Sequence, residues 1–140
     1  MRLWHIDLIP YLPKSQLLAQ WRELNSIFKK QDKHILINYI YNYSKRYLKN
    51  YAIAVIGEMY KRNYDIQQWG NYNKYFNHED YATMTIAQGT ERFKEHNNEY
   101  LTICFMNLKE KYIRGQKDFT KEIYDNLCKF YAKEMMKSEC

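Results

Sequence analysis

The sequence predicts an all-α protein, a single compact domain of three long helices with shorter helices and loops. Its 140 residues have the size of one typical domain. Apolar side chains recur at helical spacing in several separate segments, which is typical of helices that bury one face. No internal repeat, low-complexity segment or linker divides the chain. We therefore expect residues 1–140 to form one domain.

The first helix is expected to begin near Pro13 and to run to about Lys30. Proline is favoured in the first turn of a helix, because its fixed φ angle suits that position and its missing N–H is not needed there. Residues 1–12, which contain Pro10, are expected to form an extended arm before this helix. An apolar stripe runs along the helix and consists of Leu17, Leu18, Trp21, Leu24 and Phe28.

The middle of the chain gives one ambiguous segment and one clear helix. Residues 35–43 fit either a helix or a strand, because apolar positions match both periods, and we favour a helix. Residues 45–62 have a regular apolar stripe with basic residues at both ends, which predicts a helix. This helix is expected to stop at Asn63, since asparagine tolerates the left-handed conformation that often ends helices.

The second half begins with an aromatic stretch and ends with two helices. Residues 67–79 are expected to form an irregular loop, whose aromatic rings either pack onto the core, which we favour, or stack on unpaired bases. Residues 80–96 are expected to be partly helical and exposed. One helix is predicted over 99–112, capped by Asn97 and stopped at Arg114-Gly115, and another over 118–137, capped by Asp118.

The charge of the chain indicates a polyanionic partner. Lysine and arginine total 22 against 16 acidic residues, which gives a net charge of +6 and a pI near 9.1. Such a balance favours nucleic acid and, less strongly, an anionic membrane surface. The 15 tyrosines could supply stacking surfaces for bases, although most are expected to pack in or near the core.

The cysteines and the hydropathy exclude several classes of protein. Cys104, Cys128 and Cys140 are odd in number and lack the spacing of a disulfide framework or of a zinc site. No apolar run is long enough for a membrane span, and the N-terminus lacks the apolar region of a signal peptide. We expect a cytoplasmic protein, a monomer, with no metal and no cofactor.

Most enzyme classes lack support in this sequence. It contains no glycine-rich phosphate loop, no nucleophile elbow and no metalloprotease motif, and its histidines are scattered. One pair of charged residues, Arg22-Glu23, lies away from the apolar stripe of the first helix. Ala19 and Ser26 share this outward side, so a bulky partner could approach it closely.

Three blocks of the chain resemble the pyrimidine-dimer DNA glycosylases, the family of phage endonuclease V. The first and most specific is the run Leu17-Leu18-Ala19-Gln20-Trp21-Arg22-Glu23-Leu24 with Phe28 and Lys33-His34, read without a gap from the first residue. The second covers residues 55–66, including the basic pair Lys61-Arg62. A weaker third block covers residues 103–113.

The resemblance implies an all-α domain that acts on duplex DNA carrying a pyrimidine dimer or an abasic site. In this family the α-amine of the N-terminal residue attacks the sugar C1′ and expels the base, and β-elimination at the resulting Schiff base cuts the strand. An α-amine suits this role, because amines of this class have a pKa of about 7.7 to 8.0 and are partly unprotonated at neutral pH. No cofactor is implied.

The resemblance also assigns the site residues. Glu23 matches the catalytic carboxylate, and Arg22 matches the neighbour that holds phosphate. Met1 is expected to supply the amine, because the bulk of Arg2 should block methionine removal. The expected DNA contacts are Arg2, Arg22, Lys33, His34, Arg46, Lys61 and Arg62.

Three departures from the family keep other functions open. The amine is expected on Met1, one residue earlier than in the phage enzyme and on a longer tether. Ser26 stands where the family has a basic residue, and the chain has no counterpart of the aromatic C-terminal tail. The alternative is therefore a helical nucleic-acid-binding module without catalysis. A third class, a protein-interaction bundle, would need only the tyrosine-rich surface.

Overall fold

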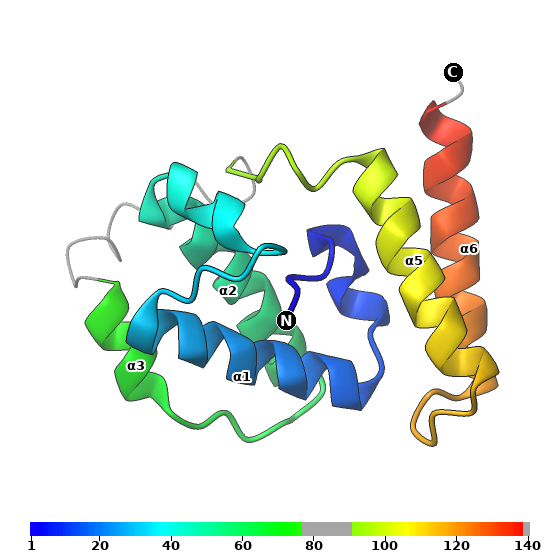
Figure 1. Cartoon of the computed structure of the whole chain (residues 1–140). Helices are drawn as coiled ribbons and strands as arrows, with labels where there is room; N and C mark the ends of the chain where they lie inside the picture. The colour runs from blue at the N-terminus through cyan, green and yellow to red at the C-terminus, as the bar shows by residue number, and fades with distance from the viewer. Residues whose placement is uncertain (77–90, 139–140) are drawn as a thin grey trace.

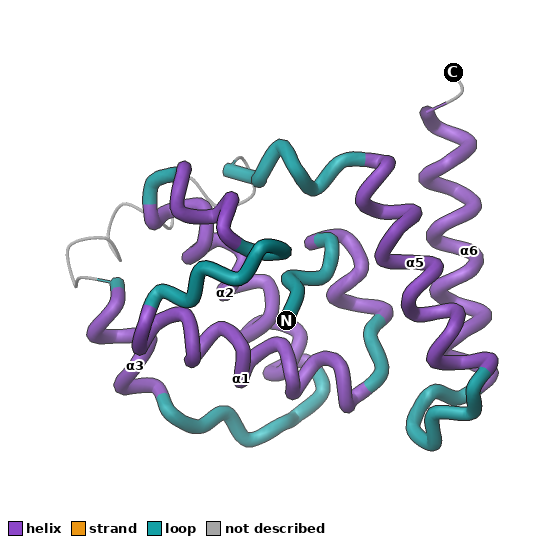
Figure 2. Tube along the Cα trace, viewed as in Figure 1, coloured by secondary structure: helices purple, strands orange, loops and turns teal. Residues whose placement is uncertain are grey.

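The described structure, a computed structural model of residues 1–76 and 91–138, is helical and confirms the predicted all-α class (Figure 1). In the part of the chain that the structure describes, no segment forms a strand (Figure 2). Four helices in these ranges are 16 to 18 residues long, one more than expected. The elements in chain order are η1 Ile6–Tyr11, α1 Lys14–Lys30, η2 Asn38–Asn42, α2 Lys45–Lys61, α3 Trp69–Tyr75, α5 Asn98–Ile113 and α6 Lys121–Ser138.

The helices pack around one apolar core. Helix α1 contacts both α2 and α3, while α5 and α6 lie side by side at one edge of the molecule (Figure 1). The short helix η1 contacts α2 and α6, and thereby joins the two groups. In the described residues, no helix is both long and apolar enough to cross a membrane.

The predicted limits of α1, α2 and α5 are confirmed to within about two residues. Pro13 precedes the first residue of α1, and Gln31 ends that helix in the left-handed region at φ 51°. Asn63, just after α2, has φ 62°, as expected for a residue that ends a helix. The Asn97 side chain accepts a hydrogen bond from the backbone N–H of Tyr100 and so caps α5.

The prediction of an extended N-terminal arm is wrong. The arm contains η1 and lies in the core. Leu3, Leu8, Ile9 and Leu12 are buried, so the arm contributes as many core side chains as a long helix does. Pro10 is compatible with this compact helix because its φ angle is close to the helical value. The Arg62 guanidinium donates to the Pro10 carbonyl at 3.1 Å and ties η1 to α2.

The predictions for the middle of the chain are confirmed in part. Residues 35–43 were expected to be helical, and Asn38–Asn42 form a short 3-10 helix. The irregular loop expected over residues 67–79 needs correction. This stretch contains α3, and its aromatic rings pack onto α1. The ring centre of Phe28 lies 5.2 Å from that of Phe76 and 5.9 Å from that of Tyr72. Because Tyr72 and Phe76 are buried, packing onto the core rather than base stacking explains them. Residues 77–90, including Tyr81, lie outside the described residues.

The segment before α5, expected to be exposed, is only partly so: among the described residues 91–96, Arg92, Lys94 and Glu95 are exposed. Glu91, Phe93 and His96 are all buried. Phe93 lies among aromatic rings, 5.4 Å from Tyr39 and 5.0 Å from Tyr43, so burial of this ring holds the segment against η2.

The prediction that Asp118 caps α6 is wrong, because Asp118 caps α1. Its Oδ2 accepts hydrogen bonds from the backbone N–H and the hydroxyl of Ser15 at 2.7 and 2.6 Å. Helix α6 begins at Lys121, and Thr120 accepts a bond from Ile123 at its N-terminus. Sequence spacing alone could not reveal a cap supplied from so far along the chain.

We predict that Asp118→Ala lowers the melting temperature at neutral pH, by the equivalent of about 0.5 to 2 kcal/mol, the usual cost of losing an N-cap. Burial of Asp118 raises the pKa of its carboxyl, but the hydrogen bonds from Ser15 and Gln116 outweigh this and leave the pKa below its ordinary value. A carboxyl of this kind stabilises the fold above its unfolded pKa and loses that contribution as the pH falls.

Thermal unfolding between about pH 7 and pH 3 tests this prediction, and the gap between the two proteins should shrink toward acid pH. The matched control is Asp65→Ala, which removes a carboxylate that accepts a hydrogen bond from the nearby Gln67. A gap that is independent of pH would contradict the assignment.

Candidate active site

The outward side of α1 carries the two residues expected to act on DNA. Arg22 is exposed and Glu23 is half-buried. Ser26 is also exposed, and its hydroxyl donates to the Arg22 carbonyl at 3.3 Å, which turns it toward its own helix. Arg22 and Ser26 are therefore accessible on this side, as the sequence predicts, while Ala19 is half-buried.

Gln20 joins Glu23 to the N-terminal arm. Its side chain is fully buried, and its Nε2 lies 3.1 Å from both the Arg2 carbonyl and Glu23 Oε2. Its Oε1 accepts a bond from the backbone N–H of Trp4 at 2.8 Å. The Tyr51 hydroxyl of α2 lies 2.9 Å from the same Oε1 and 2.6 Å from the Trp4 carbonyl oxygen. The Gln20 amide therefore fixes the arm beside Glu23.

The environment of Glu23 is partly apolar and partly cationic. Burial raises the pKa of its carboxyl above the ordinary value. The charge of the Met1 α-amine opposes this rise, as do a hydrogen bond from the Arg2 backbone, the charge of Arg22 and the Gln20 amide. The amine of Met1 and the carboxylate of Glu23 are thus close enough to interact electrostatically.

The Arg2 side chain lies over aromatic rings. Its guanidinium carbon is 5.9 Å from the centre of the Trp4 ring and 5.8 Å from that of Tyr100. Such stacking of a cation on two rings is stabilising. The Tyr100 hydroxyl donates to the Leu3 carbonyl at 2.5 Å, so α5 holds the arm at two neighbouring residues.

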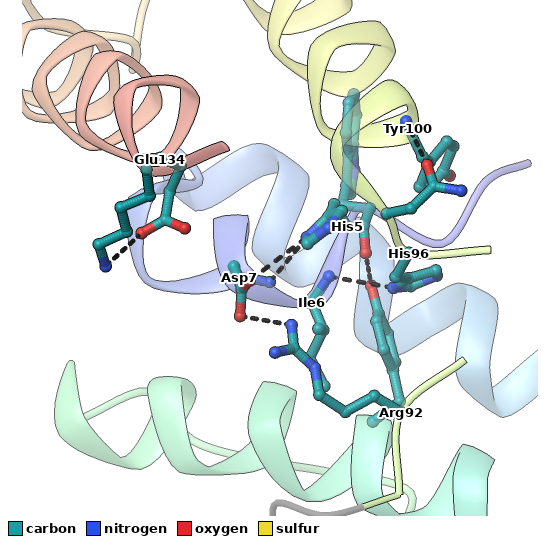
Figure 3. Close-up of polar contacts among 11 residues, drawn as sticks. His5, Ile6, Asp7, Arg92, His96, Tyr100 and Glu134 are labelled. Atoms are coloured by element: carbon teal, nitrogen blue, oxygen red, sulfur yellow. Dashed lines mark hydrogen bonds and ion pairs between the residues drawn. The ribbon is translucent and has the colours of Figure 1, made fainter. Parts of the chain in front are cut away.

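A buried histidine pair holds the next part of the arm (Figure 3). The ring centres of His5 and His96 are 5.4 Å apart. His96 Nδ1 accepts from the backbone N–H of Ile6 at 3.1 Å, and His5 Nδ1 accepts from that of Asp7 at 3.1 Å. Asp7 in turn pairs with Arg92 at 2.6 Å. Residues 5–7 are therefore bonded to the segment before α5.

His96 is neutral and has a defined tautomer. Burial, with the charges of His5 and Arg92, lowers its pKa to about 3. Because Nδ1 accepts the Ile6 bond, the single ring proton resides on Nε2, which lies 2.7 Å from the Tyr39 hydroxyl. The histidine pair has a structural role, because each ring forms hydrogen bonds with backbone N–H groups or with a tyrosine hydroxyl.

The structure separates the expected DNA contacts into two groups. Arg46 pairs with Glu91, and Arg62 donates to Glu58 at 2.7 Å and to Pro10, so both guanidinium groups hold the fold together. Lys33, His34 and Lys61 are exposed. The His34 ring accepts a bond from the backbone N–H of Leu36 at 3.1 Å, which shapes the turn after α1.

Sequence reasoning missed Gln20 although a signal for it was present. Gln20 lies one helical turn after Leu17 and one turn before Leu24, on the apolar stripe of α1. A polar residue at such a position is buried when the helix packs, and a buried amide needs partners. His5 and His96 gave no comparable signal, because their partners come from distant parts of the chain.

The arrangement defines an all-α protein with an amine and a carboxylate beside an exposed arginine. In the ranges that the structure describes, no three His, Cys, Asp or Glu side chains are grouped to hold a metal ion. Residues 1–69 match the family model described as pyrimidine dimer DNA glycosylase. The family resemblance seen in the sequence is thereby confirmed for the N-terminal half of the chain. No curated protein and no solved structure matches the chain.

We predict that Gln20→Leu lowers the free energy of unfolding by about 2 to 5 kcal/mol. The change leaves the Trp4 N–H and the Arg2 carbonyl without their partner, and an unpaired buried group costs about 1 to 3 kcal/mol. Denaturant unfolding followed by circular dichroism measures the loss.

The matched control is Gln16→Leu, the same change one turn earlier on α1. Gln16 is half-buried, and in the ranges that the structure describes its side chain exchanges hydrogen bonds with Gln116 alone. Equal losses in the two variants would show that Gln20 is not the central tie.

We further predict that Glu23→Gln raises the melting temperature at pH 7. Because the folded pKa of Glu23 is raised, its ionised form opposes folding at neutral pH and the neutral form does not. The gain should vanish as the pH falls below the ordinary glutamate pKa of about 4.3. Thermal unfolding against pH checks this, with the exposed Glu122→Gln as control. A destabilised Glu23→Gln protein at pH 7 would contradict the prediction.

Proposed function

We propose that this protein is a DNA repair enzyme that removes pyrimidine dimers from duplex DNA as a glycosylase and then cuts the strand as an abasic-site lyase. The observation that supports this most strongly is that the half-buried carboxyl of Glu23 lies within electrostatic range of the Met1 α-amine, whose charge lowers the pKa of that carboxyl. The match of residues 1–69 to the pyrimidine dimer DNA glycosylase family supports the same reaction.

In the proposed reaction the unprotonated Met1 amine attacks the sugar C1′ of the damaged nucleotide. The bond from C1′ to the base breaks, and the base leaves with the electron pair. Opening of the sugar ring moves one proton from the attacking nitrogen to O4′ and leaves an iminium between Met1 and C1′. The positive charge that develops on the sugar is stabilised by the carboxylate of Glu23.

Strand cleavage follows by loss of a proton from the sugar C2′. Glu23 is proposed to accept this proton, and the bond from C3′ to the phosphate oxygen breaks as the double bond forms. Water then hydrolyses the imine and frees the amine. A carboxyl of raised pKa suits this step, because it holds a proton more readily than an exposed glutamate.

The arrangement of α1 explains how the strand could be held during these steps. Arg22 is exposed beside Glu23 and can pair with a phosphate of the damaged strand. Reaching C1′ requires distortion of the duplex, and the open side at Ser26 leaves room for it. Arg2 acts in this proposal by stacking on Trp4 and Tyr100, which anchors the residue that follows the amine.

The test is a comparison of binding and cleavage for Glu23→Gln. We expect the variant to bind a duplex that carries one pyrimidine dimer with affinity close to the original protein, because glutamine preserves the shape of the site. Strand cleavage should fall by at least about 100-fold, the lower range for a lost general base. Gel assays on one end-labelled duplex give both quantities.

Arg22→Ala serves as the complementary variant. It should weaken binding by about 1 to 3 kcal/mol, the scale of a lost charged hydrogen bond, with less effect on cleavage at saturating protein. Cleavage by Glu23→Gln at the original rate would remove Glu23 from its role. Binding without cleavage by the unaltered protein would favour the non-catalytic DNA-binding alternative.

A further inference from the structure

A basic pocket lies beyond the site, where the end of α1 meets α2 and α3. Its volume is about 350 Å³, and Phe28 and Tyr75 form its aromatic wall. Three lysines from three different helices reach it, and none of the described residues that line it carries a carboxylate. The described lining residues are Phe28, Lys29, Gln31, Lys45, Asn71, Lys74 and Tyr75.

The three lysines, Lys29, Lys45 and Lys74, are exposed and have no acidic partner in the described ranges of the chain. Elsewhere in those ranges Arg46, Arg62 and Arg92 each pair with a carboxylate. Three like charges that share a pocket repel one another, so an anion that enters it gains from all three.

The wall of the pocket is fixed by packing. The Phe28 and Tyr75 ring centres are 5.3 Å apart, and Phe28 is buried. Lys45 Nζ lies 4.2 Å from the centre of the Tyr75 ring and donates to the Tyr75 carbonyl at 3.2 Å. Gln31 Nε2 donates to the Tyr75 hydroxyl at 3.4 Å. One ammonium is therefore held in place before any ligand arrives.

The position of the pocket relates it to the proposed active site. Lys29 follows Arg22 by two turns on the same exposed face of α1, about 10 Å along the helix axis. Successive phosphates of one DNA strand are separated by about 3.4 Å along the duplex axis. A strand that runs along α1 from Arg22 would bring a phosphate to the pocket about three nucleotides away.

We propose that this pocket binds a backbone phosphate of the DNA strand that flanks the damaged nucleotide. The choice of DNA as the ligand rests on the proposed function. The chemistry that recognises the ligand is that of a phosphate ester held by Lys29, Lys45 and Lys74 above the Tyr75 ring. A free nucleotide or inorganic phosphate offers the same chemistry from another source, and the experiment separates the two.

The experiment compares two triple variants of the full chain. In the pocket variant, Lys29, Lys45 and Lys74 are changed to glutamine, which keeps most of each side chain. In the control variant, the exposed Lys117, Lys129 and Lys133, near or on α6, are changed in the same way. Both proteins lose the same charge. Circular dichroism confirms folding, and the double variant of the exposed Lys29 and Lys74 replaces the triple if it does not fold.

The measured quantity is the dependence of DNA affinity on salt. Each lysine that contacts a phosphate contributes about 0.9 to the slope of log affinity against log salt. We expect the pocket variant to lose about 2 to 3 in slope and at least tenfold in affinity near physiological salt, and the control variant to lose less than about 1. Equal slopes in the two variants would overturn the proposal.

Two further readings separate the outcomes. The cleavage rate at saturating protein should be unchanged in the pocket variant, because no pocket residue touches Met1 or Glu23. If the unaltered protein does not cleave, the proposed function fails, but the salt slopes still decide the pocket. Calorimetric titration with inorganic phosphate tests the other source. If the pocket variant no longer binds inorganic phosphate but its salt slope for DNA equals that of the control variant, the pocket binds a free phosphate. That result would contradict a contact with the DNA strand.

Discussion

The buried amide of Gln20 is the interaction on which the site depends. It bonds the Arg2 carbonyl, the Trp4 N–H and the Glu23 carboxylate, and it is reached by the Tyr51 hydroxyl from α2. An apolar side chain here would fill the same space but would leave the arm free to shift past α1. The relation between the N-terminal amine and Glu23 is therefore set by folding, and the catalytic proposal follows from a packed core rather than a mobile tail.

Holding the arm in this way assigns different tasks to the basic residues. Arg2, Arg46 and Arg62 stack on rings or pair with carboxylates, and so belong to the structure as much as to the surface. Arg22, Lys29 and Lys74 have no such partner among the described residues, and Lys45 lies over the Tyr75 ring but pairs with no carboxylate there. Two of these cations, Arg22 and Lys29, share the exposed face of α1, so part of the net charge of +6 lies beside Glu23 and leads toward the pocket.

Local sequence patterns predicted the helices well. They could not predict contacts between segments that are far apart in the sequence. The limits of α1 followed from Pro13 and the apolar stripe. The arm was mispredicted because its burial depends on partners such as His96, and Asp118 was assigned to the wrong helix because it caps Ser15 across the fold. The place of Glu23 came from a family resemblance. Gln20 was predictable in principle, as a polar residue on a buried stripe, but its partners were not.

The most direct test of the account is borohydride trapping followed by mass spectrometry. The protein is incubated with duplex DNA that carries a pyrimidine dimer or an abasic site, the imine is reduced, and the modified residue is mapped. The account predicts a covalent adduct on the α-amine of Met1 with either duplex. An adduct on a lysine side chain would retain an enzyme but contradict the proposal that Met1 is the nucleophile, and no adduct despite binding would contradict the proposed reaction itself.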